Sequence, residues 1–124
     1  MRPQPLLAVT DVEASSRWYQ RLLGCQSGHG GPVYEQLLWN GQIVAQLHSF
    51  ESGHSHGAIG DRDKKPYGNG VLLWFEVDDF DGIMSRAAEM NVQIVLPRHR
   101  NPAEIPSGSV VNTHRRMGHV VRPK

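Results

Sequence analysis

The stretch GNGVLLWFEVDDFDG, residues 68–82, runs from a turn through an apolar strand into the first turn of a helix. The stretch PQPLLAVTDVEASSRWY, residues 3–19, makes the same transition earlier in the chain. In each case an aspartate, Asp79 or Asp11, stands where an N-cap belongs, because its carboxylate can accept the free N–H groups of the first helical turn. One strand-to-helix corner therefore occurs twice, which predicts two modules of similar build.

The residues that follow Asp11 predict the rest of the first module. Apolar side chains recur at helical spacing as far as Leu23, and Gly24 can take the left-handed conformation that ends a helix. Two strands, 34–39 and 42–49, are expected next. They are joined at Asn40-Gly41, the strongest short-range signal for a hairpin.

The second module repeats this plan with a less regular end. We expect a strand over 71–77, a helix from Asp79 that closes at Asn91, and a strand over 92–96. A polar loop over 97–108 follows. Short final strands are expected around four valines: Val110, Val111, Val120 and Val121.

Length and composition restrict the class of protein. A chain of 124 residues predicts one domain, with module one over about 3–50, a Gly- and charge-rich linker over about 51–69, and module two over about 70–124. There is no long apolar segment for a membrane span or a secretory signal, and Cys25 has no second cysteine to pair with. These features predict a cytoplasmic protein, and a net charge of +1 argues against a nucleic-acid partner.

Strand alternation predicts a ligand-binding cleft. Leu72, Trp74 and Glu76 share one face of their strand, while Gln46 and His48 point away from the apolar side of theirs. Two modules whose sheets meet edge to edge can curve around a shared concavity. The prediction is an α+β fold in which a curved mixed sheet surrounds a cleft. The predicted ligand-binding residues are Gln4, Gln46, His48, Trp74 and Glu76.

Three segments in this order resemble the vicinal oxygen chelate superfamily, which includes glyoxalase I, bleomycin-resistance proteins and extradiol dioxygenases. They are LLAVTDVEASSRWYQRLLG, LLWNGQIVAQLH and GNGVLLWFEVDDFDGIMSRAAEMN, and the resemblance covers roughly residues 3–97. It implies paired βαβββ modules, often assembled as a homodimer, with clefts built from sheet residues.

Enzymes of this superfamily hold one divalent ion with four side chains, and the resemblance places these at Gln4, Gln46, Leu72 and a residue near Val110. Leucine and valine cannot donate an electron pair, and a neutral glutamine oxygen lacks the charge of a glutamate. We therefore expect no cofactor and no complete metal site. A divalent metal stays possible, with Gln4 and Gln46 as the weak candidates.

Other side chains allow both a chemical and a structural interpretation. His48 and Glu76 are candidate catalytic groups. His48 could act as base or acid, or be a satisfied histidine of the sheet. Glu76 and Glu35 have two interpretations. A carboxylate inside an apolar cleft would have a raised pKa, whereas a carboxylate at the rim of the cleft would simply be solvated. Trp74 suits either ligand contact or packing. The two histidines of GHSHG, His54 and His56, fit an exposed loop better than a metal site.

Three functions follow from these observations. The first is a small-molecule binding protein of the bleomycin-resistance type, whose dimer cleft takes up an aromatic or cationic compound without a metal. The alternative is a divalent-metal-dependent lyase or dioxygenase of the glyoxalase type. A second alternative is a degenerate copy with no activity. Leu72 discriminates between the first two, because a binding protein tolerates it and a metalloenzyme of this kind does not.

Overall fold

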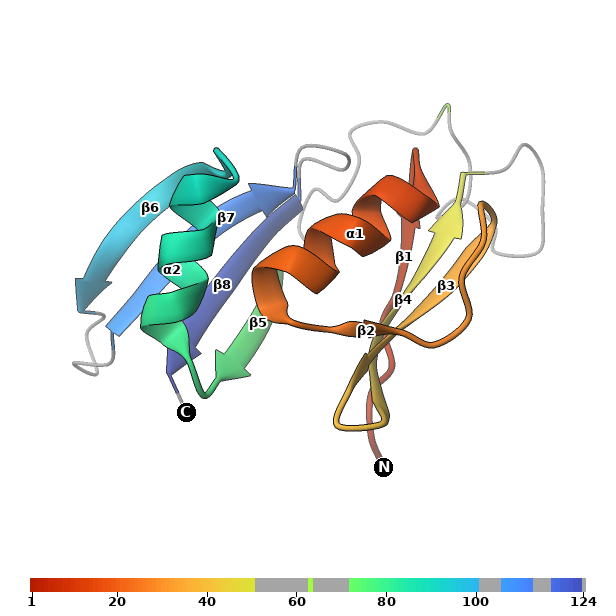
Figure 1. Ribbon diagram of the computed structural model, residues 1–124, viewed down its shortest axis with the longest axis horizontal. Helices are drawn as coiled ribbons and strands as arrows, with labels where there is room; N and C mark the ends of the chain where they lie inside the picture. The colour runs from red at the N-terminus through yellow and green to blue at the C-terminus, as the bar shows by residue number, and fades with distance from the viewer. Residues whose placement is uncertain (51–62, 64–71, 101–105, 113–116, 124) are drawn as a thin grey trace. The chain divides into compact units, whose positions relative to one another are not determined.

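The computed structural model describes residues 1–50, 63, 72–100, 106–112 and 117–123, and it divides the chain into two compact units, Met1–Pro66 and Tyr67–Lys124. The described residues of each unit, taken by itself, form one helix and one four-stranded sheet (Figure 1). The expected linker, including His54 and His56, lies outside the described residues except for Asp63. Neither described helix has the length and apolar character needed to cross a membrane.

The first unit is a βαβββ module with a mixed sheet. Its elements are β1 (Leu6–Val9), α1 (Val12–Leu23), β2 (Gln26–Ser27), β3 (Tyr34–Trp39) and β4 (Gln42–Ser49). The strand order is β1-β4-β3-β2, with β1 parallel to β4 and the other pairs antiparallel. The predicted strands 34–39 and 42–49 are confirmed, whereas β2 was not foreseen because two residues carry no periodicity.

The second unit has the same topology. Its elements are β5 (Leu72–Val77), α2 (Phe80–Glu89), β6 (Gln93–Arg100), β7 (Pro106–Asn112) and β8 (Met117–Pro123), in the order β5-β8-β7-β6 with β5 parallel to β8. The doubled corner is therefore a repeated module, as predicted. The predicted polar loop 97–108 is wrong at both ends, because β6 continues through Pro97. A register shift between Leu96 and His99 spans that proline, which has no N–H for the ladder.

The predicted helix and turn signals are present in the structure. Asp11 Oδ1 accepts a hydrogen bond from the Ala14 amide at 2.9 Å, and Asp79 Oδ1 accepts one from the Gly82 amide at 3.0 Å. Gly24 ends α1 with φ 75°. The hairpin residues Asn40 and Gly41 have φ values of 49° and 73°, the pattern of a type I′ turn. Asn91 also takes a positive φ, 51°, one residue beyond Met90, the C-cap of α2.

The core of the first unit lies between α1 and its sheet. From the helix it takes Val12, Tyr19, Leu22 and Leu23, and from the strands Leu7, Val9, Leu37, Ala45 and Leu47. Each large aliphatic side chain among them contributes roughly 1.5–3 kcal/mol when buried. The apolar residues of the sheet thus face α1, and the alternate residues face the other way.

Candidate functional site

The side of the first sheet that faces away from α1 carries a group of polar side chains. Its orientation follows from the register, in which Tyr34 is opposite His48, and Gln36 is opposite Gln46, while their sequence neighbours Glu35 and Leu47 are buried on the helix side. The parallel pairing with β1 adds two apolar residues to the same side. We call this surface the polar sheet face; it consists of Leu6, Ala8, Tyr34, Gln36, Gln46 and His48.

A directional chain of hydrogen bonds crosses the polar sheet face. The Nε2 of Gln46 donates to the backbone carbonyl oxygen of Gln4 at 3.2 Å, which leaves its Oε1 to accept from the Tyr34 hydroxyl. Gln36 Nε2 donates to Tyr34 Oη at 3.3 Å. Because a carbonyl oxygen can only accept, the Gln4 carbonyl fixes the direction of every bond along the chain.

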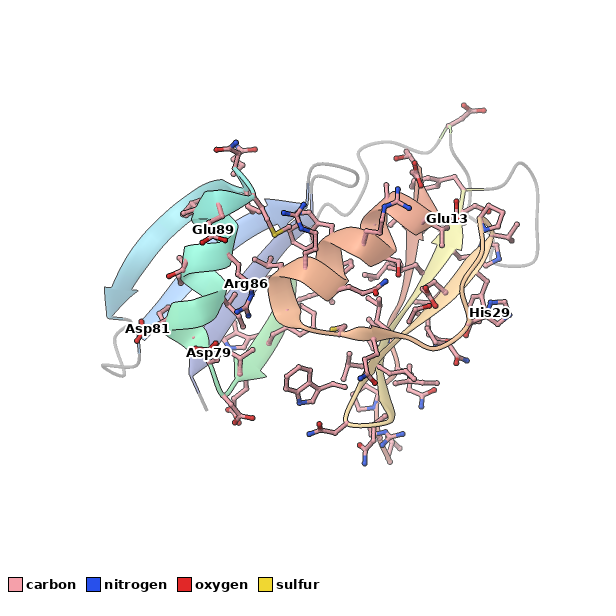
Figure 2. The ribbon with its side chains drawn as sticks, in the orientation of Figure 1. Glu13, His29, Asp79, Asp81, Arg86 and Glu89 are labelled. Carbon is pink, nitrogen blue, oxygen red and sulfur yellow. The ribbon has the colours of Figure 1, made fainter. Side chains whose placement is uncertain are left out.

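Two imidazole rings lie beside Tyr34. The His29 ring packs edge-on against the Tyr34 ring with centroids 5.0 Å apart, and the His48 ring lies 6.5 Å away on the other strand. His29 projects from the segment between β2 and β3 (Figure 2). The Nδ1 of His48 lies 2.8 Å from the Ser49 carbonyl oxygen, so Nδ1 carries the proton of a neutral ring and Nε2 carries the lone pair. His48 thus belongs to the polar sheet face, as predicted.

Glu35 points to the opposite side of the sheet and is buried there, so neither of the two interpretations considered for it, an apolar cleft or a solvated rim, describes its position. Its side chain is only 3% exposed. The carboxylate accepts from the hydroxyls of Ser27 and Ser16 at 2.7 and 2.9 Å, and from the amides of Gly30 and His29 at 2.8 and 3.0 Å. Glu35 therefore joins α1, β2 and the segment before β3 around one buried charge.

The pKa of Glu35 shows the effect of these donors. Burial alone would raise it, but the hydrogen bonds from Ser27, Gly30, His29 and Ser16 outweigh burial and lower the pKa from 4.5 to about 2. Glu35 is thus a permanently ionised structural group at neutral pH. It is unsuited to act as a general base.

Trp74 and Glu76 lie on β5 of the second unit. The alternation is as predicted, since Leu72, Trp74 and Glu76 are exposed while Leu73 and its alternate neighbours are half-buried. Leu72 is 54% exposed and Trp74 is 52% exposed, an unusual exposure for two large apolar side chains on one strand face. Trp74 therefore provides a flat apolar surface on β5.

The residues at the expected metal-ligand positions do not fit a divalent ion. In the first unit the amide of Gln46 is oriented with its nitrogen toward the Gln4 backbone, and its oxygen already accepts from Tyr34. A cation at Gln46 Oε1 would share a neutral oxygen with the Tyr34 hydroxyl proton, and a single uncharged donor holds a divalent ion poorly. Within the described part of the chain, no group of three or more His, Cys, Asp or Glu side chains could hold a metal.

The register of the second sheet also corrects the fourth expected ligand position. In the first unit, Leu6 pairs with Gln46. Trp74 is the equivalent of Leu6 in the second unit, because it lies at the same distance before its N-cap aspartate, and it pairs with Val120. The position that corresponds to Gln46 is therefore Val120 on β8, whereas Val110 lies on β7. Valine offers no electron pair, so the correction leaves this position, like Leu72, without a donor.

Cys25 has no features of a reactive thiol. It is buried, and burial raises its pKa to about 11, with a hydrogen bond of its own backbone acting weakly in the opposite direction. A thiol with this pKa is protonated at neutral pH and is a poor nucleophile.

Two residues of the polar sheet face, Tyr34 and Gln36, were not among the predicted site residues. Both lie on β3, which was predicted with the correct bounds. Their position opposite His48 and Gln46 depends on a register shift between Leu37 and Leu38. Counting outward from the Asn40-Gly41 turn without that shift would place Gln36 opposite Ala45. The polar character of Tyr34 and Gln36 was therefore visible in the sequence, but the register that places them opposite His48 and Gln46 was not.

The repeated βαβββ units define the fold class of the protein, and similarity to known proteins identifies its family. The family model described as Glyoxalase/Bleomycin resistance protein/Dioxygenase superfamily matches residues 3–104. The chain belongs to this superfamily, which confirms the resemblance seen in the sequence. A comparison with proteins of curated function gives no significant match.

Solved structures share the fold at low sequence identity. A fosfomycin resistance protein, FosX from Listeria monocytogenes, described as complexed with Mn(II) and a sulfate ion, is 13% identical with a TM-score of 0.71, over 99% of this chain and 89% of that one. Lactoylglutathione lyase from Agrobacterium tumefaciens is 15% identical with a TM-score of 0.72, over 99% and 92%. A family enzyme from Burkholderia phytofirmans PsJN is 15% identical with a TM-score of 0.77, over 95% and 94%.

Proposed function

We propose that this protein binds a small organic molecule, as bleomycin-resistance proteins do, and that it does so without the metal site of the superfamily's enzymes. One observation carries the proposal. Gln46, the ligand-position residue of β4, has its amide fixed between the Gln4 backbone and Tyr34 in an uncharged hydrogen-bond chain. An uncharged amide held in a fixed orientation can form hydrogen bonds with an organic ligand, but it lacks the charge that a divalent cation needs from its ligands.

The composition of the polar sheet face supports a ligand of moderate polarity. Its hydrogen-bonding groups are two amides, a phenol and an imidazole, and aliphatic side chains from β1 lie beside them. This mixture of apolar walls with a few oriented polar groups is typical of small-molecule sites. Trp74 is proposed as a stacking surface for an aromatic part of the ligand, because its ring is exposed on β5.

The proposal includes features of assembly that stay predictions. The cleft shared by the two modules, the homodimer and the cytoplasmic location all come from the sequence and the resemblance. The alternative, a metal-dependent lyase or dioxygenase, is supported by the fold shared with FosX and with lactoylglutathione lyase. Fold alone does not transfer chemistry, and the residues at the ligand positions oppose it.

Two assays on the same preparation test the proposal. Calorimetric titration with metal-free bleomycin and a panel of planar aromatic compounds is expected to give at least one saturable ligand with a Kd of about 10 µM or tighter. Formation of lactoylglutathione in the presence of Mn(II) or Ni(II) is expected to stay at the level without protein. Trp74→Ala should weaken ligand binding about tenfold while leaving the unfolding midpoint unchanged. Metal-dependent turnover without a saturable ligand would contradict the proposal.

A further inference from the structure

The end of the hydrogen-bond chain at Gln36 has a defined chemical character. Since the Gln4 carbonyl fixes the direction of the chain, Tyr34 gives its only proton to Gln46. Gln36 must then donate to Tyr34 Oη and therefore turns an N–H toward it. Among the hydrogen bonds of the described residues, the Oε1 of Gln36 and its second N–H have no protein partner.

The surroundings hold Gln36 in place. Its backbone amide donates to Glu35 Oε1 at 2.9 Å, and its backbone carbonyl accepts from the Gly28 amide at 2.8 Å. The strand is thus anchored to the buried carboxylate on one side and to the segment after β2 on the other. A half-buried amide on a rigid strand loses little conformational freedom when it binds a ligand.

From this geometry we infer that Gln36 forms hydrogen bonds with a neutral amide-like edge of the ligand, in which a hydrogen-bond donor and an acceptor lie side by side. Carboxamides, lactams and pyrimidine-type rings present such an edge, and a glutamine amide pairs with it through one N–H and one oxygen. The Tyr34 ring, with His29 packed against it, adds an aromatic surface next to this amide. Tyr34 and Gln46 are positioning residues, because they orient Gln36 through the chain.

The absence of formal charge restricts the ligand further. Every hydrogen-bonding side chain of the polar sheet face is uncharged when its histidine is neutral, and the buried carboxylate of Glu35 lies on the opposite side of the sheet. A carboxylate or phosphonate ligand would meet no cationic side chain on this face, and an amidinium would meet no anionic one. This inference rests on the proposed function and specifies its ligand class.

Four small probes built on one benzene ring test the inference by NMR titration of the full-length protein. Benzamide carries the donor and the acceptor, N,N-dimethylbenzamide only the acceptor, benzoate only charged acceptors, and benzamidine only charged donors. We expect benzamide to shift the resonances of residues 34–36 and 46, and to bind about fivefold more tightly than each of the other three.

Variants assign this preference to Gln36. Gln36→Glu is expected to reverse the order so that benzamidine binds more tightly than benzamide, because a carboxylate pairs with an amidinium. Gln36→Met should weaken benzamide about fivefold without favouring benzamidine. Tyr34→Phe should remove the difference between benzamide and N,N-dimethylbenzamide. Gln26→Glu, an exposed control on β2, should leave all four affinities unchanged.

The outcomes separate this inference from the proposed function. If the probes shift the polar sheet face and Gln36→Glu leaves their order unchanged, the role of Gln36 is refuted while ligand binding on this face stands. If none of the four probes shifts residues 34–36 or 46, the inference is refuted. Binding of bleomycin or an aromatic panel compound would then still uphold the proposed function.

Discussion

Replacement of Glu35 by glutamine is expected to lower the free energy of unfolding by about 3 kcal/mol at neutral pH. The pKa of Glu35 falls from 4.5 to about 2 on folding, and each pKa unit corresponds to about 1.4 kcal/mol of preference for the ionised form. Glutamine would direct an NH₂ group at hydroxyls and amides that all donate to Glu35. Urea unfolding followed by circular dichroism measures the loss.

The loss of stability caused by Glu35→Gln is expected to depend on pH. The folded-state pKa is depressed, so the stabilisation by Glu35 is fully present above about pH 4.5 and is lost as the pH falls toward about 2. The difference in unfolding free energy between the wild type and Glu35→Gln should therefore shrink across this window. Glu13→Gln, at an exposed position in the first turn of α1 (Figure 2), is the control and should cost less than about 0.5 kcal/mol. A constant difference from pH 6 to pH 2 would contradict the role of Glu35.

Truncation of Leu47 to alanine should cost about 3 kcal/mol or more. Leu47 is fully buried on β4, opposite Leu7 of β1 and Glu35 of β3, so the cavity would lie at the centre of the first sheet. It also stands between Gln46 and His48 in the sequence. We therefore expect the loss of stability to be accompanied by weaker ligand binding, measured by calorimetry at a temperature where the variant is folded.

Val44→Ala on the same strand is the matched control for Leu47. Val44 is half-buried, so its truncation removes fewer contacts and should cost less than half as much. Equal losses for the two variants would show that the side of β4 that faces α1 is not the centre of the core. The urea midpoints of both variants, measured at one pH, make the comparison.

Local signals in the sequence were sufficient for most of the fold. Asp11 and Asp79 cap their helices because their carboxylates accept free N–H groups of the first helical turn, and Asn40-Gly41 turns because both residues accept a positive φ. Where such a signal was weak, the prediction failed. The chain continues as a strand through Pro97, since a shift of register accommodates a residue that usually ends one.

The candidate site was only partly predictable. Gln46 and His48 were identified from alternation along one strand, which is a local property. Tyr34 and Gln36 lie opposite them only because of the register shift between Leu37 and Leu38, and alternation along a single strand does not predict such a shift. The orientation of Gln46 likewise depends on the backbone of Gln4, although the sequence had suggested the side chain of Gln4 instead.

The role of Glu35 could not be read from its position on a strand. An isolated carboxylate between a tyrosine and a glutamine suggests the polar side of a sheet, whereas the structure buries it against α1 with hydroxyl and amide donors from three segments. In the sequence those donors precede Glu35 by 5 residues at Gly30 and by 19 residues at Ser16, which lies within α1. Only the folded chain brings them to one point.

The claim that the polar sheet face binds no divalent cation is tested most simply by an NMR titration of the metal-free protein with Mn(II). The unpaired electrons of Mn(II) broaden the resonances of nearby nuclei. Because Gln46 Oε1 accepts from Tyr34 and the corresponding positions of the second unit carry no donor, we expect residues 4–8, 34–36 and 46–48 to keep their signal intensities at one equivalent of Mn(II). Selective loss of those signals at one equivalent would show a cation bound on the polar sheet face and would contradict the account.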